Sequence, residues 1–159
     1  MEYLSLYSHK LLVTLLLSMV PVLELRGAIP IGVALGLNYW HAIGISIVGN
    51  LIPVPFLILF TKRVFELIRS ISPKLNTLVV KLEDRAASKS EIVQRYAFWG
   101  LLILVAIPLP GTGAWTGSLV AAMLNMRVRR AFPAIALGVI IAGLIVAFVT
   151  YGAGTIFFS

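Results

Sequence analysis

The chain alternates long uncharged stretches with short charged ones. Residues 11–23, 27–61, 96–126 and 131–159 contain no Lys, Arg, Asp or Glu. Uncharged apolar runs of this length are typical of helices that cross or enter a lipid bilayer. The pattern therefore predicts an all-α integral membrane protein.

Two of these stretches contain segments that we expect to cross the membrane as complete helices, residues 39–60 and 131–151. Each would reach about 32 Å as a helix, which matches a hydrocarbon core of about 30 Å. Asn50, followed by Pro53 and Pro55, predicts a polar and kinked place within the first of these helices.

The stretch at 96–126 is interrupted in its middle by Pro108-Leu-Pro-Gly-Thr-Gly. These residues break a continuous helical hydrogen-bond ladder and leave two arms of about 18–20 Å, each too short to cross. Arg95 and Arg127 flank the stretch, and the positive-inside rule places both in the cytoplasm. We therefore expect residues 96–126 to form a re-entrant hairpin.

Residues 11–37 have a similar design. An apolar arm up to Leu23 is followed by Glu24-Leu-Arg-Gly-Ala-Ile-Pro-Ile-Gly, which we expect to break the helix before the chain returns. This pattern predicts a second re-entrant hairpin, which enters from the outside. The charges at Glu2 and Lys10 leave one alternative open, a single helix that crosses from Leu11 to Leu37.

Residues 61–99 hold eight basic and four acidic side chains, which predicts a cytoplasmic connector. Within it, apolar residues recur at helical spacing and predict an amphipathic helix: Leu75, Leu78, Val79, Leu82, Ala86 and Ile92. A solvated linker helix without a function of its own is the alternative. Hairpin plus span on each side of this connector indicates an inverted repeat, an arrangement of many secondary transporters.

Composition narrows the function classes. The chain is 60% hydrophobic and 12% charged, with a net charge of +7. Because the basic residues flank apolar runs and form no stripe on a soluble face, we expect membrane lipids and no nucleic acid as partners. The chain has no Cys, and its two histidines, His9 and His41, stand apart, so we expect no disulfide, metal or cofactor. We expect no cleaved signal peptide and a multi-pass protein of the cell membrane, the inner or plasma membrane.

Glu24 and Arg26 are the charged residues that we expect at membrane depth. A charge there costs about 2.5–3.5 kcal/mol on insertion scales, so such residues usually pair, line a wet cavity or bind something. Arg26 suits a phosphate or carboxylate, and Glu24 in a partly dry cavity suits proton coupling. The alternative is a structural pair, or side chains that reach the interface.

The second break adds prolines, glycines that free the backbone to turn, and small polar groups, which suit either a ligand site or a purely structural hairpin tip. The candidate substrate- and proton-binding residues are Glu24, Arg26, Gly27, Pro30, Asn50, Pro108, Pro110, Gly111, Thr112, Gly113 and Trp115.

With Glu24-Leu-Arg-Gly-Ala-Ile-Pro-Ile-Gly and Pro108-Leu-Pro-Gly-Thr-Gly-Ala-Trp-Thr-Gly-Ser in view, nearly the whole chain resembles the family of small multidrug export proteins. The layout of two hairpins, with Glu and Arg at one of them, also looks like the DedA or VTT superfamily. That superfamily includes undecaprenyl phosphate translocases and lipid scramblases. The second break here lacks the Arg of the DedA motif, which weakens an anion clamp from both sides.

We expect a small membrane transporter that moves an anionic or lipid-phosphate substrate, such as a polyprenyl phosphate, in a proton-linked cycle. The alternative is proton-coupled export of small cationic drugs, with Trp40 and Trp115 stacking on the cation. An enzyme is not expected, because Ser118 has no evident base with an orienting acid. A non-transporting membrane assembly factor stays an alternative, and a homodimer would help so short a chain to enclose a path.

Overall fold

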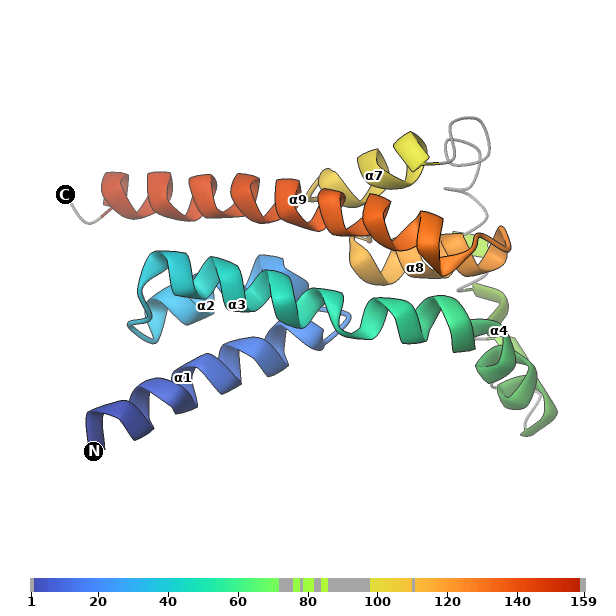
Figure 1. Ribbon diagram of the computed structural model, residues 1–159, viewed down its shortest axis with the longest axis horizontal. Coiled ribbons are helices and arrows are strands. Elements are labelled where there is room, and N and C mark those ends of the chain that lie inside the picture. The colour runs from blue at the N-terminus through green and yellow to red at the C-terminus, as the bar shows by residue number, and fades with distance from the viewer. Residues whose placement is uncertain are drawn as a thin grey trace. The chain divides into compact units, whose positions relative to one another are not determined.

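The computed structural model describes residues 2–71, 76–77, 79–81, 84–85, 98–109 and 111–157, and over these ranges it contains helices and no strand. The predicted all-α class is confirmed (Figure 1). The main helices are α1 (Glu2–Met19), α2 (Glu24–Ala34), α3 (Tyr39–Leu51), α4 (Pro53–Ile71), α7 (Phe98–Ala106), α8 (Ala114–Met123) and α9 (Val128–Phe157).

Two stretches of helix in the described ranges are long and apolar enough to cross a membrane, Tyr39–Leu67 and Val128–Gly152. They contain the two predicted spans, 39–60 and 131–151, and extend beyond both. The first consists of α3 and most of α4, which meet at Ile52. Pro53 is tolerated there because it is the first residue of α4, where its missing N–H would have no partner within that helix.

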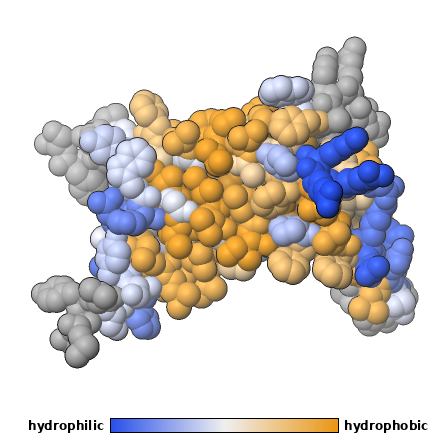
Figure 2. Space-filling model, viewed as in Figure 1, coloured by the Kyte–Doolittle hydropathy of each residue, from blue (hydrophilic) through white to orange (hydrophobic). Residues whose placement is uncertain are grey.

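One face of α9 exposes a continuous set of large apolar side chains. Figure 2 shows hydrophobic side chains over this helix, and hydrophilic ones near the place where it begins. A surface of this kind is unfavourable in water and suits the hydrocarbon interior of a bilayer. Its exposed residues are Leu137, Ile140, Ile141, Leu144, Ile145, Phe148 and Val149.

The chain divides into two compact units. The first unit holds Met1–Pro53 and Val139–Ser159, and the second holds Val54–Gly138. In the first unit α1, α2 and α3 pack against one another, and in the second α7 packs against α8. The helix α9 passes through the boundary, so its beginning belongs to the second unit and its end to the first.

The first helix pair breaks at 20–23, which corrects the predicted break at Glu24 to Gly32. Pro21 follows the end of α1 closely, and a proline disfavours helix both at its own position and at the residue before it. The predicted break instead forms most of α2, with Pro30 inside it. Burial of neighbouring residues such as Leu25 and Ile29 offsets the lost backbone hydrogen bond. A single helix from 11 to 37 is not observed.

The second helix pair breaks between the end of α7 at Ala106 and the start of α8 at Ala114, and the predicted break at this place is confirmed. Gly111 has φ 77° and Gly113 has φ 126°, a conformation that favours glycine. α7 has 9 residues and α8 has 10, so each reaches about 15 Å or less and cannot cross alone. Entry of either helix pair into a membrane as a re-entrant hairpin stays a prediction.

The short helices α2 and α8 end in the same backbone motif. Gly36 has φ 82°, and the next N–H, from Leu37, donates to the Gly32 carbonyl at 3.0 Å. Asn125 has φ 54°, and Met126 N–H donates to the Ala121 carbonyl at 2.9 Å. Both are Schellman-type ends with a left-handed residue after the helix. In each unit the next helix, α3 or α9, begins three residues after that left-handed residue.

A close glycine contact also recurs. Gly49 is the eleventh residue of α3, and a Cβ there would lie 2.6 Å from the Leu15 carbonyl oxygen of α1 and would overlap the Ser18 hydroxyl. Gly138 is the eleventh residue of α9, and a Cβ there would lie 2.9 Å from the Leu102 carbonyl oxygen of α7 and 2.7 Å from Val105 Cβ. The two units therefore share a local design, while the inverted membrane orientation of the two halves stays a prediction.

The predicted amphipathic helix falls largely outside the described residues. The described pieces, 76–77, 79–81 and 84–85, are helical. Val79 is buried and Lys81 is exposed, as the apolar and polar faces of that prediction require. Leu75, Leu78, Leu82, Ala86 and Ile92 lie outside the described residues, so an amphipathic helix over the whole segment stays a prediction.

Candidate functional site

The register between α2 and α3 is set by one contact and a short turn. A Cβ on Gly32 would lie 3.2 Å from Ala42 Cβ, and the turn at 35–38 makes the two helices antiparallel neighbours. Glu24 lies eight residues before Gly32, and Asn50 lies eight residues after Ala42. Both therefore lie about 12 Å from that contact in the same direction. Glu24 and Asn50 occupy the same level of the first unit.

Four buried polar side chains lie around this level. Glu24 is 5% exposed, Asn50 is 1% exposed, and Ser18 and Ser46 are fully buried. Ser46 precedes Asn50 by one helical turn, so the two share a face of α3. Ser18 of α1 lies against Gly49, next to Asn50 in the sequence. We call Ser18, Glu24, Ser46 and Asn50 the polar cluster.

Two atoms of the polar cluster lack a hydrogen-bond partner among the described residues, Ser46 Oγ and Asn50 Oδ1. The Ser18 hydroxyl, in contrast, donates to the Leu15 carbonyl oxygen at 2.6 Å. Leaving a buried polar atom unpaired costs about 1–3 kcal/mol, so such an atom in a native protein calls for a physical explanation. The interior of the first unit therefore holds two buried oxygen atoms that no described residue satisfies.

Glu24 holds an unusual backbone conformation for its residue type. It has φ 47°, and its N–H donates to the Val20 carbonyl at 2.8 Å as the chain turns into α2. Left-handed backbone is uncommon for residues other than glycine, and such conformations cluster at functional sites. Arg26 is half-buried and lies within the electrostatic influence of Glu24. The two charges that the sequence singled out therefore act on each other at the start of α2.

The second unit repeats this arrangement with apolar side chains. Val105 of α7 lies against Gly138 as Ser18 lies against Gly49. Counting from the two glycines along α3 and α9, Ser46 corresponds to Ile135. Asn50 corresponds to Val139, the residue of α9 that directly follows the end of the second unit at Gly138. Ile135 is fully buried. The same helix contact therefore forms with apolar side chains at these positions, so it does not require a polar cluster.

Two predicted site residues of the first motif, Gly27 and Pro30, contribute to the shape of α2. A Cβ added at Gly27 would lie 3.0 Å from the Leu23 side chain, so a larger residue would crowd that side chain. The Gly27 N–H donates to the Leu23 carbonyl at 2.9 Å. Pro30 lies within α2 and is partly exposed. These residues shape α2 around Glu24 and Arg26.

The second motif, in the second unit, is tied together by its own hydroxyl groups. Thr112 Oγ1 lies 2.7 Å from the carbonyl oxygens of both Ile107 and Leu109, and Thr116 Oγ1 donates to the Gly111 carbonyl at 3.1 Å. The turn also contains Pro108 and Gly113, and Trp115 lies in the first turn of α8. Pro110 lies outside the described residues. Thr112 therefore acts on the backbone of the turn, and the structural-tip alternative is the one that these contacts favour.

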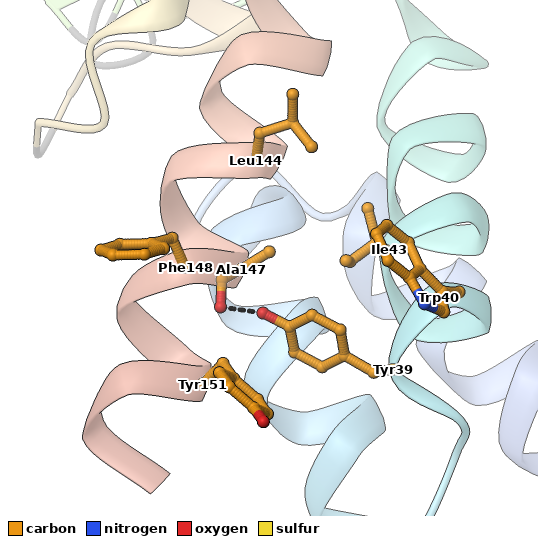
Figure 3. Close-up of a pocket in the computed structure, with 7 residues that line it drawn as sticks. All are labelled: Tyr39, Trp40, Ile43, Leu144, Ala147, Phe148 and Tyr151. Carbon is orange, nitrogen blue, oxygen red and sulfur yellow. Dashed lines mark hydrogen bonds between the residues drawn. The ribbon is translucent and has the colours of Figure 1, made fainter. Parts of the chain in front are cut away.

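An aromatic pocket lies between the start of α3 and the end of α9, within the first unit (Figure 3). Its volume is about 470 Å³, and the Tyr39 hydroxyl closes one side by donating to the Ala147 carbonyl oxygen. The Tyr39 and Tyr151 rings have centroids 5.6 Å apart. Sequence reasoning had singled out only Trp40 here. The lining residues are Tyr39, Trp40, Ile43, Leu144, Ala147, Phe148 and Tyr151.

Sequence reasoning also missed Ser18 and Ser46. A signal for Ser46 was present, because a serine one helical turn before Asn50 repeats a polar position on one face of an apolar helix. Ser18 had no such signal, since its place against Gly49 depends on how α1 packs. Among the described residues no three His, Cys, Asp or Glu side chains gather in one place, as the usual zinc and calcium sites require.

Comparison with protein families gives a match. The family described as "Putative small multi-drug export protein" matches residues 24–145. No curated protein and no solved structure matches the chain. Because this match covers most of the chain and begins at Glu24, the chain belongs to this family. The family description and the two apolar helices together make it a small membrane export protein.

Proposed function

We propose that this family member exports an anionic substrate in a proton-linked cycle, in which Glu24 carries the proton and Arg26 binds the anionic group. A lipid phosphate of the polyprenyl phosphate type is the substrate class that we propose. The observation that carries the proposal is the buried Glu24 carboxyl group, held at φ 47° beside a half-buried arginine.

The chemistry of Glu24 supports proton coupling. A carboxyl group enclosed by apolar helices changes its interactions strongly when it gains or loses a proton, because the interior has a low dielectric constant. Loss of the proton would leave a negative charge within reach of Arg26, and gain of the proton would release that attraction. The affinity of Arg26 for an incoming anion would therefore depend on the protonation of Glu24.

The chemistry of Arg26 supports an anionic substrate. Its guanidinium group offers several N–H donors in a fixed planar fork, which matches the oxygens of a phosphate or carboxylate. Arg26 is half-buried, so solvent screens it less than the exposed arginines, such as Arg63 of α4. A phosphate group that reached α2 would find this cation close to the proton-carrying carboxyl group.

The test is transport of a polyprenyl phosphate in proteoliposomes that carry an imposed pH gradient. We expect Arg26→Ala to lose at least tenfold in rate, because the charged hydrogen bonds to the phosphate contribute about 1.5–3 kcal/mol. Glu24→Gln is expected to transport without response to the gradient. Arg63→Ala, which removes an exposed arginine, is the control and should keep the wild-type rate. Unchanged transport by Arg26→Ala would overturn the proposal.

A second function, export of small cationic drugs, is favoured by the aromatic pocket. The faces of Tyr39, Trp40 and Tyr151 are negative and attract a flat organic cation by cation–π interactions. The positive charge of Arg26 in the same unit opposes a cation at α2. Ethidium efflux that is abolished in Glu24→Gln and improved in Arg26→Ala would establish this function in place of the first.

We also propose a membrane arrangement for the transporter. It is a multi-pass protein of the plasma membrane, works as a homodimer, and holds its two helix pairs as re-entrant hairpins. Cysteine at position 38 should then react from the outside, and cysteine at position 128 from the cytoplasm. Labelling of position 128 from the outside would contradict the re-entrant arrangement of α7 and α8.

A further inference from the structure

We propose that the polar cluster, Ser18, Glu24, Ser46 and Asn50, is a binding site for a sodium ion. The inference deepens the proposed function, because it rests on the role of Glu24 as the coupling residue and gives that residue a second cation to exchange with the proton. The proposal rests on one observation. The buried carboxyl group of Glu24 lies around the same level of the first unit as two buried oxygen atoms without a partner among the described residues, Ser46 Oγ and Asn50 Oδ1.

The atoms of the polar cluster suit a hard cation. Ser46 Oγ and Asn50 Oδ1 are buried acceptors without a partner among the described residues. The Ser18 hydroxyl directs its hydrogen to the Leu15 carbonyl, so its oxygen keeps lone pairs for another ligand. With the carboxylate of Glu24, the cluster offers an all-oxygen set of ligands, the kind that hard metal ions prefer. An anion would be repelled by the negative charge of the Glu24 carboxylate.

The charge of the polar cluster selects a monovalent ion. Glu24 is its single acid, so one positive charge neutralises it. Calcium sites rely on several carboxylates, and magnesium retains much of its water, so neither suits a buried site with one acid. Sodium is small enough to be held by hydroxyl, amide and carboxylate oxygens together, and membrane transporters use such oxygen ligands for Na⁺ or H⁺.

The second unit supplies an internal comparison. The corresponding positions Val105 and Ile135 are apolar, as is Val139 directly after the unit ends, and the same glycine contact forms there. Two unpaired buried polar atoms cost about 1–3 kcal/mol each, and the fold has a version without that cost. The first unit therefore keeps its polar residues for a ligand and not for packing.

Other charges on α1, α2 and α3 act on this site to different degrees. Arg26 is the nearest cation and competes with Na⁺ for the charge of Glu24. It lies two residues further along α2, about 200° around the helix, so its side chain leaves on another side. His9 and Lys10 of α1 and His41 of α3 are all at least one helical turn from the polar cluster in sequence.

The experiment is thermal unfolding of the purified full chain in detergent, followed by tryptophan fluorescence, with NaCl, KCl or choline chloride at equal ionic strength and pH 8. At Na⁺ well above its Kd we expect the wild-type Tm to rise by about 5 °C, with saturation. KCl and choline chloride should leave the Tm unchanged. Equal Tm values in the three salts would overturn the proposal.

The substitution Asn50→Val places in the polar cluster the residue that α9 has at the corresponding position, Val139. We expect this variant to unfold at or above the wild-type Tm in choline chloride, because the unpaired amide is gone, and to lose the response to Na⁺. Glu24→Gln should lose the response as well. Ser118→Ala, which removes a buried serine of the second unit whose hydroxyl donates to the Ala114 carbonyl, is the matched control and should keep the full response.

A persistent Na⁺ response in both Asn50→Val and Glu24→Gln would also overturn the proposal. Binding of ²²Na⁺ to the wild type and to these two variants gives an independent readout, with the same expected pattern. Failure of the Na⁺ site leaves the proposed function testable, because transport driven by a pH gradient is measured without sodium. If transport driven by the pH gradient is absent, Na⁺ binding can still be measured, so the two proposals can fail separately.

Discussion

The close contact at Gly49 leads to a prediction about stability. A methyl group at this position would lie 2.6 Å from the Leu15 carbonyl oxygen, whereas ordinary contacts of a Cβ lie at 3.4–4 Å. The oxygen belongs to the backbone of α1 and cannot rotate away, so α1 and α3 must separate by about 0.8 Å at this level. Such overpacking costs about 1–3 kcal/mol, and the overlap with Ser18 places Gly49→Ala near the upper end.

Gly44 of the same helix provides the control, because a Cβ there meets nothing within 4 Å. Both substitutions make the same change in helix propensity, which favours alanine by about 0.5–1 kcal/mol. The difference in unfolding free energy between Gly49→Ala and Gly44→Ala therefore isolates the overlap, and we expect about 3 kcal/mol. That difference corresponds to a factor of about 150 in the unfolding equilibrium constant.

The assay is equilibrium unfolding in mixed micelles with a rising fraction of SDS, followed by tryptophan fluorescence. Gly138→Ala should shift the transition in the same direction as Gly49→Ala, since a Cβ at Gly138 also meets a backbone oxygen, at 2.9 Å. Equal transitions for Gly49→Ala and Gly44→Ala would refute the packing of α1 against α3 described above.

Two further predictions use the same unfolding assay. Gly113→Ala forces a side chain onto a backbone with φ 126°, so it should destabilise the folded protein by about 1–3 kcal/mol. An unfolding transition equal to that of the wild type would contradict this turn geometry. Tyr39→Phe removes the hydroxyl that donates to the Ala147 carbonyl but keeps the ring against Tyr151. We expect the unfolding free energy to fall by about 1 kcal/mol, and an unchanged value would mean that this hydrogen bond is absent.

The predictable parts of the fold depend on local physics. An uncharged run that matches a bilayer is visible in the sequence, so the helices around 39–60 and 131–151 could be predicted. The break at 107–113 could also be predicted, because Gly111 and Gly113 supply the positive φ angles that such a turn requires. The break in the first half was misplaced, since the charge of Glu24 and the presence of Pro30 outweighed the signal of Pro21.

The candidate site was only half predictable. Glu24 and Arg26 are conspicuous as charges in an apolar region, and Asn50 as a polar residue within an apolar helix. Their arrangement depends on the register between α2 and α3, which the contact of Gly32 with Ala42 sets. No local pattern in the sequence encodes such a contact between helices, so the level shared by Glu24 and Asn50 emerges only from the structure.

The division of the chain has a consequence for the order in which the protein is completed during synthesis. The second unit is one continuous stretch, Val54–Gly138, so a ribosome delivers all of it before the last part of α9 exists. The first unit starts earlier but needs that last part, where Gly143 lies against Ile47 and Ala147 accepts from Tyr39. The half of the protein that contains Glu24 is thus begun first and finished last. A nascent chain stopped near Gly138 would hold a complete second unit, while the aromatic pocket could not yet form.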